Sequence, residues 1–104
     1  IAKGEIQSKK VYEDDDLVVF HDIHPAAPVH LLMVPKLHLE SLLTAEAQHA
    51  PLLGKMLVLA PRLAREQGAT DGFRIVINNG PDGGQEVYHL HVHVLGGPRP
   101  WKRL

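Results

Sequence analysis

Apolar residues along the chain fall into four short runs and one long helical stripe. β-Branched and aromatic residues at 17–22 predict a strand, and the apolar run 29–34 predicts a second one. The Pro-rich segment 23–28 predicts a turn between them, so the two strands should form an antiparallel hairpin with a long connection. The runs 73–77 and 87–95 predict two further strands.

A helix is predicted to start after Thr44, which is a good N-cap residue, and to continue to about Gln67, with Gly68 as its C-cap. Its apolar residues recur at helical spacing and form one stripe: Leu52, Leu53, Met56, Leu59, Leu63 and Ala64. Pro51 and Pro61 fall within this span, which predicts a kink or an early break.

The order strand, strand, helix, strand, strand predicts an α+β fold, with an antiparallel sheet and the main helix on one face. The 104 residues fit one domain, over 1–104. The formal net charge is −1, so the chain lacks the excess of positive charge that would bind a nucleic-acid backbone, which argues against a DNA or RNA binder. The chain contains no cysteine, which excludes disulfides and thiolate metal sites and fits a cytoplasmic protein.

No apolar run approaches the roughly 20 residues that a membrane-spanning helix needs, and no secretory signal is recognisable.

The unusual feature is histidine, with eight in the chain. His89, His91 and His93 alternate with apolar residues, so in a strand the three imidazoles share one face at roughly 7 Å spacing.

Such a row of imidazoles predicts either a zinc site or nucleophilic catalysis by histidine. The segment 78–85 leads directly into the histidines and is rich in Gly and Asn, which suits a loop whose backbone N–H groups surround a phosphate. A zinc site does not need such a loop. The favoured scheme is therefore attack of a neutral imidazole on phosphorus, with a second histidine protonating the leaving group.

The segment His89-Leu90-His91-Val92-His93-Val94-Leu95 resembles the signature of the histidine triad superfamily, in which three histidines alternate with apolar residues. Further segments resemble the Hint branch, in order and at its spacing: Phe20-His21-Asp22-Ile23, Ala27-Pro28-Val29-His30, Pro35-Lys36-Leu37-His38, Asp82-Gly83-Gly84-Gln85-Glu86-Val87-Tyr88 and Leu95-Gly96-Gly97. A uridylyltransferase of the superfamily would have Gln in place of His93. The resemblance covers nearly the whole chain.

This resemblance implies a purine nucleoside phosphoramidase that acts as a homodimer, with the sheet extended across the interface and no metal or other cofactor. His91 matches the nucleophile that becomes nucleotidylated. His93 and His30 match histidines that contact the phosphate and assist proton transfer, and His89 matches the residue that orients the nucleophile. Acyl- or aminoacyl-adenylates are further expected substrates.

The resemblance also implies a nucleotide site, with Asp22 as the ribose-binding acid. The other residues that it implies are Phe20 and Ile23 around the base and Asn78, Gly84 and Gln85 in the phosphate loop. Animal Hint proteins have a serine where this chain has Glu86, and bacterial members resemble this chain there, which favours a bacterial protein. A carboxylate facing a phosphate would be repelled, so we expect the backbone N–H of Glu86 to contact the phosphate. The tail of Hint relatives helps to form the partner chain's site, so the resemblance implies that Trp101, in a short tail, contributes to the site of the partner.

Two other function classes stay open at this point. One is a purine-nucleotide-binding module or regulatory partner protein with vestigial activity. The other is a metal-dependent protein that uses His89, His91 and His93 as ligands. Turnover in the presence of a chelator would separate the enzyme from both.

Overall fold

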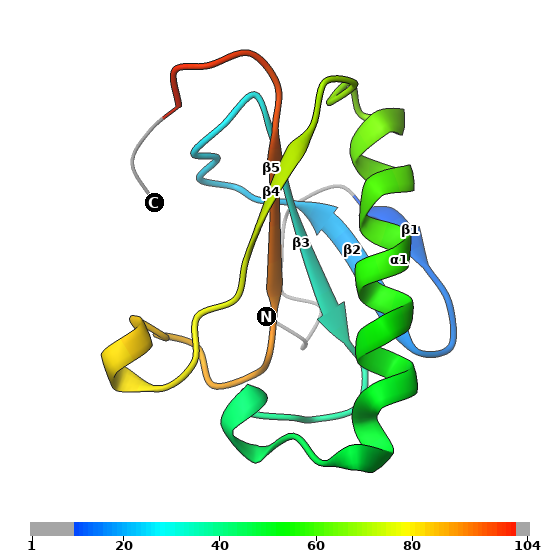
Figure 1. Ribbon diagram of the computed structural model, residues 1–104, viewed down its shortest axis with the longest axis vertical. Helices are drawn as coiled ribbons and strands as arrows, with labels where there is room; N and C mark the ends of the chain where they lie inside the picture. Colours follow the sequence, from blue (N-terminus) through cyan, green and yellow to red (C-terminus); the bar gives the residue numbers. More distant parts are fainter. Residues whose placement is uncertain (1–9, 102–104) are drawn as a thin grey trace.

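The computed structural model describes residues 10–101 as an antiparallel sheet with one main helix packed on it (Figure 1). The five strands lie in the order β1-β2-β3-β5-β4. Their bounds are Lys10–Glu13 (β1), Leu17–His21 (β2), Val29–Pro35 (β3), Phe73–Val76 (β4) and Val92–Gly96 (β5). The helix α1 spans Ala50–Glu66, and within the described residues no helix is long and apolar enough to cross a membrane. The α+β class is confirmed.

The predicted hairpin is present as β2 and β3, which pair antiparallel with Val19 opposite Met33. β5 pairs with the other side of β3, and β4 lies beyond it at the sheet edge. β1, which the sequence analysis did not predict, adds to β2 with Tyr12 opposite Val19. It has only four residues and charged ends, so its apolar pattern is too short to stand out.

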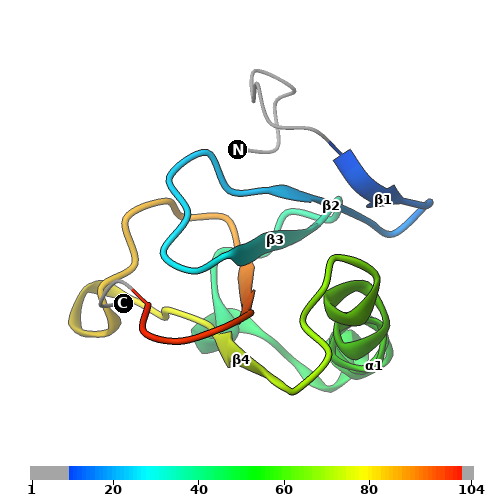
Figure 2. The same ribbon diagram turned by 90° about the horizontal axis from the view of Figure 1, so that it is seen from above.

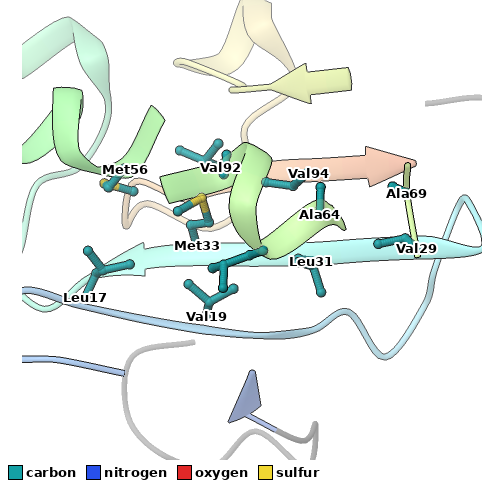
Figure 3. Close-up of a cluster of buried hydrophobic side chains, with 12 residues drawn as sticks. Leu17, Val19, Val29, Leu31, Met33, Met56, Ala64, Ala69, Val92 and Val94 are labelled. Atoms are coloured by element: carbon teal, nitrogen blue, oxygen red, sulfur yellow. The ribbon is translucent and has the colours of Figure 1, made fainter. Parts of the chain in front are cut away.

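The main core lies between α1 and one face of the sheet, as Figure 2 shows from above. The helix buries Met56, Ala60, Leu63 and Ala64, four residues at helical spacing. The sheet contributes the alternate residues of three strands: Leu17, Val19, Leu31, Met33, Val92 and Val94 (Figure 3). The opposite face of the same strands is therefore left for other side chains, and the histidines lie there.

The predicted start of the helix at Thr44 is wrong. Two short 3₁₀ helices, Leu42–Thr44 and Ala47–His49, precede α1. The hydroxyl of Thr44 donates to the Ser41 carbonyl and so closes the first of these turns. Pro51 occupies the first turn of α1, where its missing N–H costs no hydrogen bond.

Pro61 does not break the helix, contrary to the predicted early break. Proline removes the hydrogen bond to the carbonyl four residues earlier, which here belongs to Leu57. Leu57 lies on the exposed side of the helix, where water can satisfy that carbonyl. The buried residues Ala60 and Leu63 on either side of the proline hold the helix against the sheet.

The last strand begins at Val92 rather than at residue 87, so this prediction is wrong over its first five residues. Residues 85–90 instead bond to the segment that follows β3. The Leu90 N–H donates to the Leu39 carbonyl, and the Gln85 side chain donates to the Glu40 carbonyl. This local pairing takes the chain away from the sheet, and His91 therefore lies immediately before β5.

Removing the Leu63 side chain should test the packing of α1 on the sheet. Leu63 is 1 % exposed, and Leu63→Ala should lower the free energy of unfolding by about 2–5 kcal/mol because it leaves a cavity in the core. Leu57→Ala is the matched control, because Leu57 is 49 % exposed on the same helix and should lose far less. Urea denaturation of both variants measures the difference, and equal losses would contradict the packing described.

Candidate active site

Three strands place the candidate site on the sheet face opposite α1. In the strand register, Leu32 of β3 pairs with His93 of β5 on one side and with Phe20 of β2 on the other. His30 lies two residues before Leu32 and is therefore the diagonal neighbour of His93. Long side chains in such diagonal positions can meet across a sheet. The sheet register alone thus brings two of the predicted catalytic histidines together.

His30 and His93 form a direct hydrogen bond. His30 Nε2 lies 2.9 Å from His93 Nδ1, and the ring centroids are 5.2 Å apart. The other ring nitrogen of His30, Nδ1, accepts the backbone N–H of Ala26 at 2.9 Å. A neutral imidazole has one N–H and one lone pair, so His30 must bear its proton on Nε2 and donate it to His93. His93, which accepts at Nδ1, then has its own proton on Nε2.

His91 has the complementary tautomer. Its Nδ1 lies 2.8 Å from the backbone carbonyl of His89, and a carbonyl can only accept. Nδ1 therefore bears the proton, and the lone pair is on Nε2. Within residues 10–101 we find no hydrogen bond to that Nε2. The ring centroids of His91 and His93 are 5.1 Å apart, so a ring with a free lone pair lies next to a ring with a free N–H.

The His89 side chain lies apart from the other two triad rings. Its Nε2 donates to the Pro35 carbonyl at 2.7 Å, and its ring packs edge-on against His38 at 5.1 Å. The prediction that all three imidazoles lie in one row of a strand is therefore wrong. β5 begins at Val92, so His89 and His91 precede it and only His93 lies in the strand. His89 contacts His91 through its backbone carbonyl, while its side chain ties this segment to the end of β3.

Burial keeps both paired histidines neutral at pH 7. The pKa of His93 is lowered to about 4, first by burial and then by the nearby His91 and His30, while Asp22 opposes the shift. Burial also lowers the pKa of His30, again against the attraction of Asp22. Asp22 Oδ2 lies 3.3 Å from His30 Nε2, which is a second reason for the proton to be on that nitrogen.

Asp22 also organises the turn that follows β2. Its Oδ1 accepts the His24 N–H at 2.8 Å, and its own N–H donates to the His30 carbonyl at 2.9 Å. Ile23 and Phe20, which the resemblance places around the base, differ in burial: Ile23 is 60 % exposed, whereas Phe20 is buried in a small cluster with Leu32. Ile23 is thus open to a ligand, and Phe20 forms part of the floor of this sheet face.

Gln85 holds the glycine-rich loop in shape. It is buried, and its side-chain oxygen accepts the Gly80 N–H at 2.8 Å while its amide donates to the Val87 carbonyl at 3.0 Å. Gly84 has φ +79°, a left-handed conformation that suits glycine. Gly84 and Glu86 are exposed and Asn78 is half-buried. Because the Gln85 side chain already bonds to Gly80, Val87 and the Glu40 carbonyl, phosphate contacts from this loop would come from its backbone N–H groups.

Trp101 lies away from the triad, against Ala26, Ala27 and Leu95. Its indole N–H donates to the Gly97 carbonyl at 3.0 Å. The guanidinium groups of Arg74 and Arg99 lie 5.3 and 4.9 Å from the indole ring centroid. Together these three side chains line a hollow of about 600 Å³ beside β4. Within one chain, Trp101 thus supports the turn after β2.

Asp22, His30 and His93 have the spacing of a metal site, since one ligand atom from each lies within 4.8 Å of the others. The hydrogen bonds around them oppose that use. A neutral imidazole that binds a metal through Nε2 has its proton on Nδ1 and donates it to an acceptor. Here Nδ1 of His30 faces the N–H of Ala26, which is a donor. Asp22, His30 and His93 therefore suit a chain of hydrogen bonds better than they suit a bound cation.

Sequence reasoning missed the Ala26 N–H as part of the site. Backbone donors leave no residue-type signal, and the only trace is that Ala26 lies in a turn bounded by Pro25 and Pro28. The two other supports of the site, the Pro35 carbonyl and the His38 ring, are likewise visible only in the structure.

Comparison with known proteins gives matches over nearly the whole chain. The family profile described as HIT domain matches residues 3–99. The protein HitA of Neisseria gonorrhoeae is 54% identical, over 94% of this chain and 92% of that protein. Adenylylsulfatase HINT1 of Arabidopsis thaliana is 48% identical, over 93% of this chain and 67% of that protein. A HIT family hydrolase from Legionella pneumophila superposes with a TM-score of 0.88 at 43% identity, covering 95% of this chain and 89% of that one.

The lowered pKa of His93 should make the fold sensitive to mild acid. Between about pH 6.5 and pH 4 the unfolded chain protonates this histidine while the folded chain does not. The free energy of unfolding should therefore fall as the pH falls through that window. His93→Asn should flatten this dependence in urea denaturation series, and His24→Asn, at an exposed histidine, should leave it as in the wild type. Parallel curves for all three proteins would contradict the assignment.

Proposed function

This chain belongs to the HIT domain family, and on that premise we propose that it hydrolyses the P–N bond of purine nucleoside 5′-phosphoramidates through a covalent intermediate on His91. The observation that supports this best is the hydrogen bond from His91 Nδ1 to the His89 carbonyl. It leaves the Nε2 lone pair free to attack phosphorus. The relatives named as a hydrolase and an adenylylsulfatase support the coarser activity, nucleotide hydrolysis.

In the first step a bond forms between His91 Nε2 and phosphorus, and the P–N bond breaks. The amine needs a proton as it leaves, and His93 is the donor closest to the nucleophile. His93 is neutral in the free protein, but a bound phosphoryl anion would raise its pKa. The second proton of the resulting imidazolium would be on Nδ1, which accepts the His30 N–H in the free protein. The His30 N–H would then donate to Asp22 Oδ2, 3.3 Å away, and the Asp22 carboxylate would stabilise the positive charge.

In the second step water attacks phosphorus and displaces the His91 imidazole. His93, now neutral with its lone pair on Nε2, takes the proton of the attacking water at that nitrogen. Loss of the Nδ1 proton to solvent as the product leaves then restores the hydrogen bond from His30. The product is the nucleoside monophosphate, and both histidines return to their starting states. Neither step needs a metal ion, and no cofactor is proposed.

The nucleotide would lie across the site face, from the turn after β2 to the glycine-rich loop. The exposed Ile23 offers apolar surface to a purine, with Phe20 beneath it. Asp22 would accept ribose hydroxyls through Oδ2, because Oδ1 already accepts the His24 N–H. Backbone N–H groups near Gly84 and Glu86 would contact the phosphate, with Asn78 and Gln85 shaping the loop.

Two alternatives share this nucleotide site. Acyl- or aminoacyl-adenylates present the same adenylyl group with a different leaving group, so His91 could attack them in the same way. A purine-nucleotide-binding module without turnover is the second alternative. The free lone pair of His91 beside the N–H of His93 favours catalysis, because nucleotide binding alone does not require this pairing of tautomers.

We further propose a homodimer in which the sheets of two chains join along β4. β4 is an edge strand, and its hydrogen-bonding groups on the outer side have no strand partner within residues 10–101. Phe73 on this strand is 38 % exposed, and Ile75 is only partly buried. The hollow beside Trp101 borders the same edge, so a partner chain could approach it and bring Trp101 near its own site.

Replacing the nucleophile should abolish turnover while leaving the fold intact. His91→Ala should reduce kcat on an adenosine 5′-phosphoramidate with a fluorescent amine leaving group by roughly 10⁴-fold or more, because no covalent intermediate can form. The assay is run in EDTA, where the wild type should keep its activity. His49→Ala, in a 3₁₀ helix directly before α1 and outside the proposed site, serves as the control.

Substantial turnover by His91→Ala would overturn the nucleophile assignment. A wild type that binds the nucleoside monophosphate but turns over neither phosphoramidates nor adenylates would support the binding-module alternative. Activity that disappears in EDTA and returns with zinc would support the metal-dependent one.

The dimer should be visible as a doubled molecular mass. Light scattering after gel filtration should give twice the chain mass of 11.5 kDa for the wild type. Phe73→Lys should shift the mass toward one chain, because it places a charge at the proposed interface. Lys10→Glu, on the opposite edge strand β1, should leave the mass doubled. A single-chain mass for the wild type at high concentration would argue against this dimer.

A further inference from the structure

The turn after β2 brings one backbone N–H into the buried histidine pair. Ala26 lies between Pro25 and Ala27, and its N–H donates to His30 Nδ1 at 2.9 Å. Both residues of this bond are buried. No water or charged side chain is needed to explain the bond, and its direction is fixed, because a backbone amide nitrogen can only donate.

We propose that the Ala26 N–H is a positioning group that sets the tautomer of His30 and, through it, the tautomer of His93. His30 bears its single proton on Nε2 and donates it to His93 Nδ1. His93 is thereby left with its single proton on Nε2, the nitrogen not engaged with His30. This inference rests on the proposed function, since it explains how the N–H donor of the reaction is oriented.

The opposite tautomer of His30 would be higher in free energy because both of its ring nitrogens would face unsuitable partners. A proton on Nδ1 would meet the Ala26 N–H head-on, leaving two donors facing each other in a buried site. The lone pair on Nε2 would then face Asp22 Oδ2, 3.3 Å away, and two acceptors repel each other. Buried polar groups that lose their partners are costly. Ala26 and Asp22 therefore select the same tautomer from opposite sides of the ring.

The position of Ala26 is itself fixed by the turn. The Asp22 N–H donates to the His30 carbonyl, which closes the turn at its base. The Ala26 side chain packs with Ala27 and Leu95, and Trp101 packs against the same cluster from outside. The donor thus comes from a segment held by backbone bonding and apolar packing, without help from the imidazole rings that it orients.

Nitrogen NMR of the histidine side chains tests the first part of this proposal directly. In ¹⁵N-labelled wild-type protein near neutral pH, His30 and His93 should both show the Nε2–H tautomer, and His91 should show Nδ1–H. Finding His30 with its proton on Nδ1 would overturn the proposal. This measurement needs no substrate, so its result is independent of whether the proposed reaction occurs.

Replacing the backbone amide of Ala26 by an ester tests whether its N–H sets the tautomers of His30 and His93. Replacing Ala26 by lactic acid, through translation with the hydroxy acid, removes only the N–H and keeps the methyl side chain. The control is the same exchange at Ala27, whose N–H makes no hydrogen bond within residues 10–101. The ester at 26 should mix the His30 and His93 tautomers in the nitrogen spectrum, and the ester at 27 should not.

The kcat of each ester variant should fall only where its His30 and His93 tautomers are mixed. The ester at position 26 should lower kcat by roughly tenfold, the effect of losing about one hydrogen bond, with little change in KM, while the ester at 27 keeps wild-type kinetics. Unchanged tautomers and kcat in the ester at 26 would overturn the proposal. A wild type with the expected tautomers but no turnover would instead overturn the proposed function and leave the tautomer assignment standing.

Discussion

The site depends on the fact that a neutral imidazole is a donor at one nitrogen and an acceptor at the other. Once one nitrogen has a partner of fixed character, the role of the other is determined. The Ala26 N–H fixes His30, His30 fixes His93, and the His89 carbonyl fixes His91. Backbone groups at two points of the chain therefore decide which ring offers a lone pair and which offers an N–H.

These backbone groups stay in place because the strands that hold them are set by the core on the other face of the sheet. Packing of α1 on alternate residues of β2, β3 and β5 fixes the strand register. A slip of β5 by one residue would turn His93 toward the helix and bring Val94 to the site. The same burial that stabilises the fold also removes water from the histidine pair, which lowers the pKa of His93.

Elements with a long apolar pattern could be predicted from the sequence, and elements that depend on distant partners could not. The hairpin and the buried stripe of α1 follow from residue type and spacing alone. The late start of β5 and the place of the His89 ring depend on hydrogen bonds to residues 35–40, which no local pattern encodes. His30 and His93 could be identified by resemblance, but their direct bond required the register, and the donor at Ala26 has no side-chain signature.

β5 begins between His91 and His93, so only one of these two residues is held by the hydrogen bonds of the strand. His93 belongs to a strand hydrogen-bonded on both sides, by β3 and β4, whereas His91 precedes that ladder. In the proposed reaction His91 Nε2 approaches phosphorus and then withdraws, whereas His93 gives and takes protons in place. The strand ladder holds the proposed proton donor on two sides, and the proposed nucleophile is held outside the ladder by the His89 carbonyl.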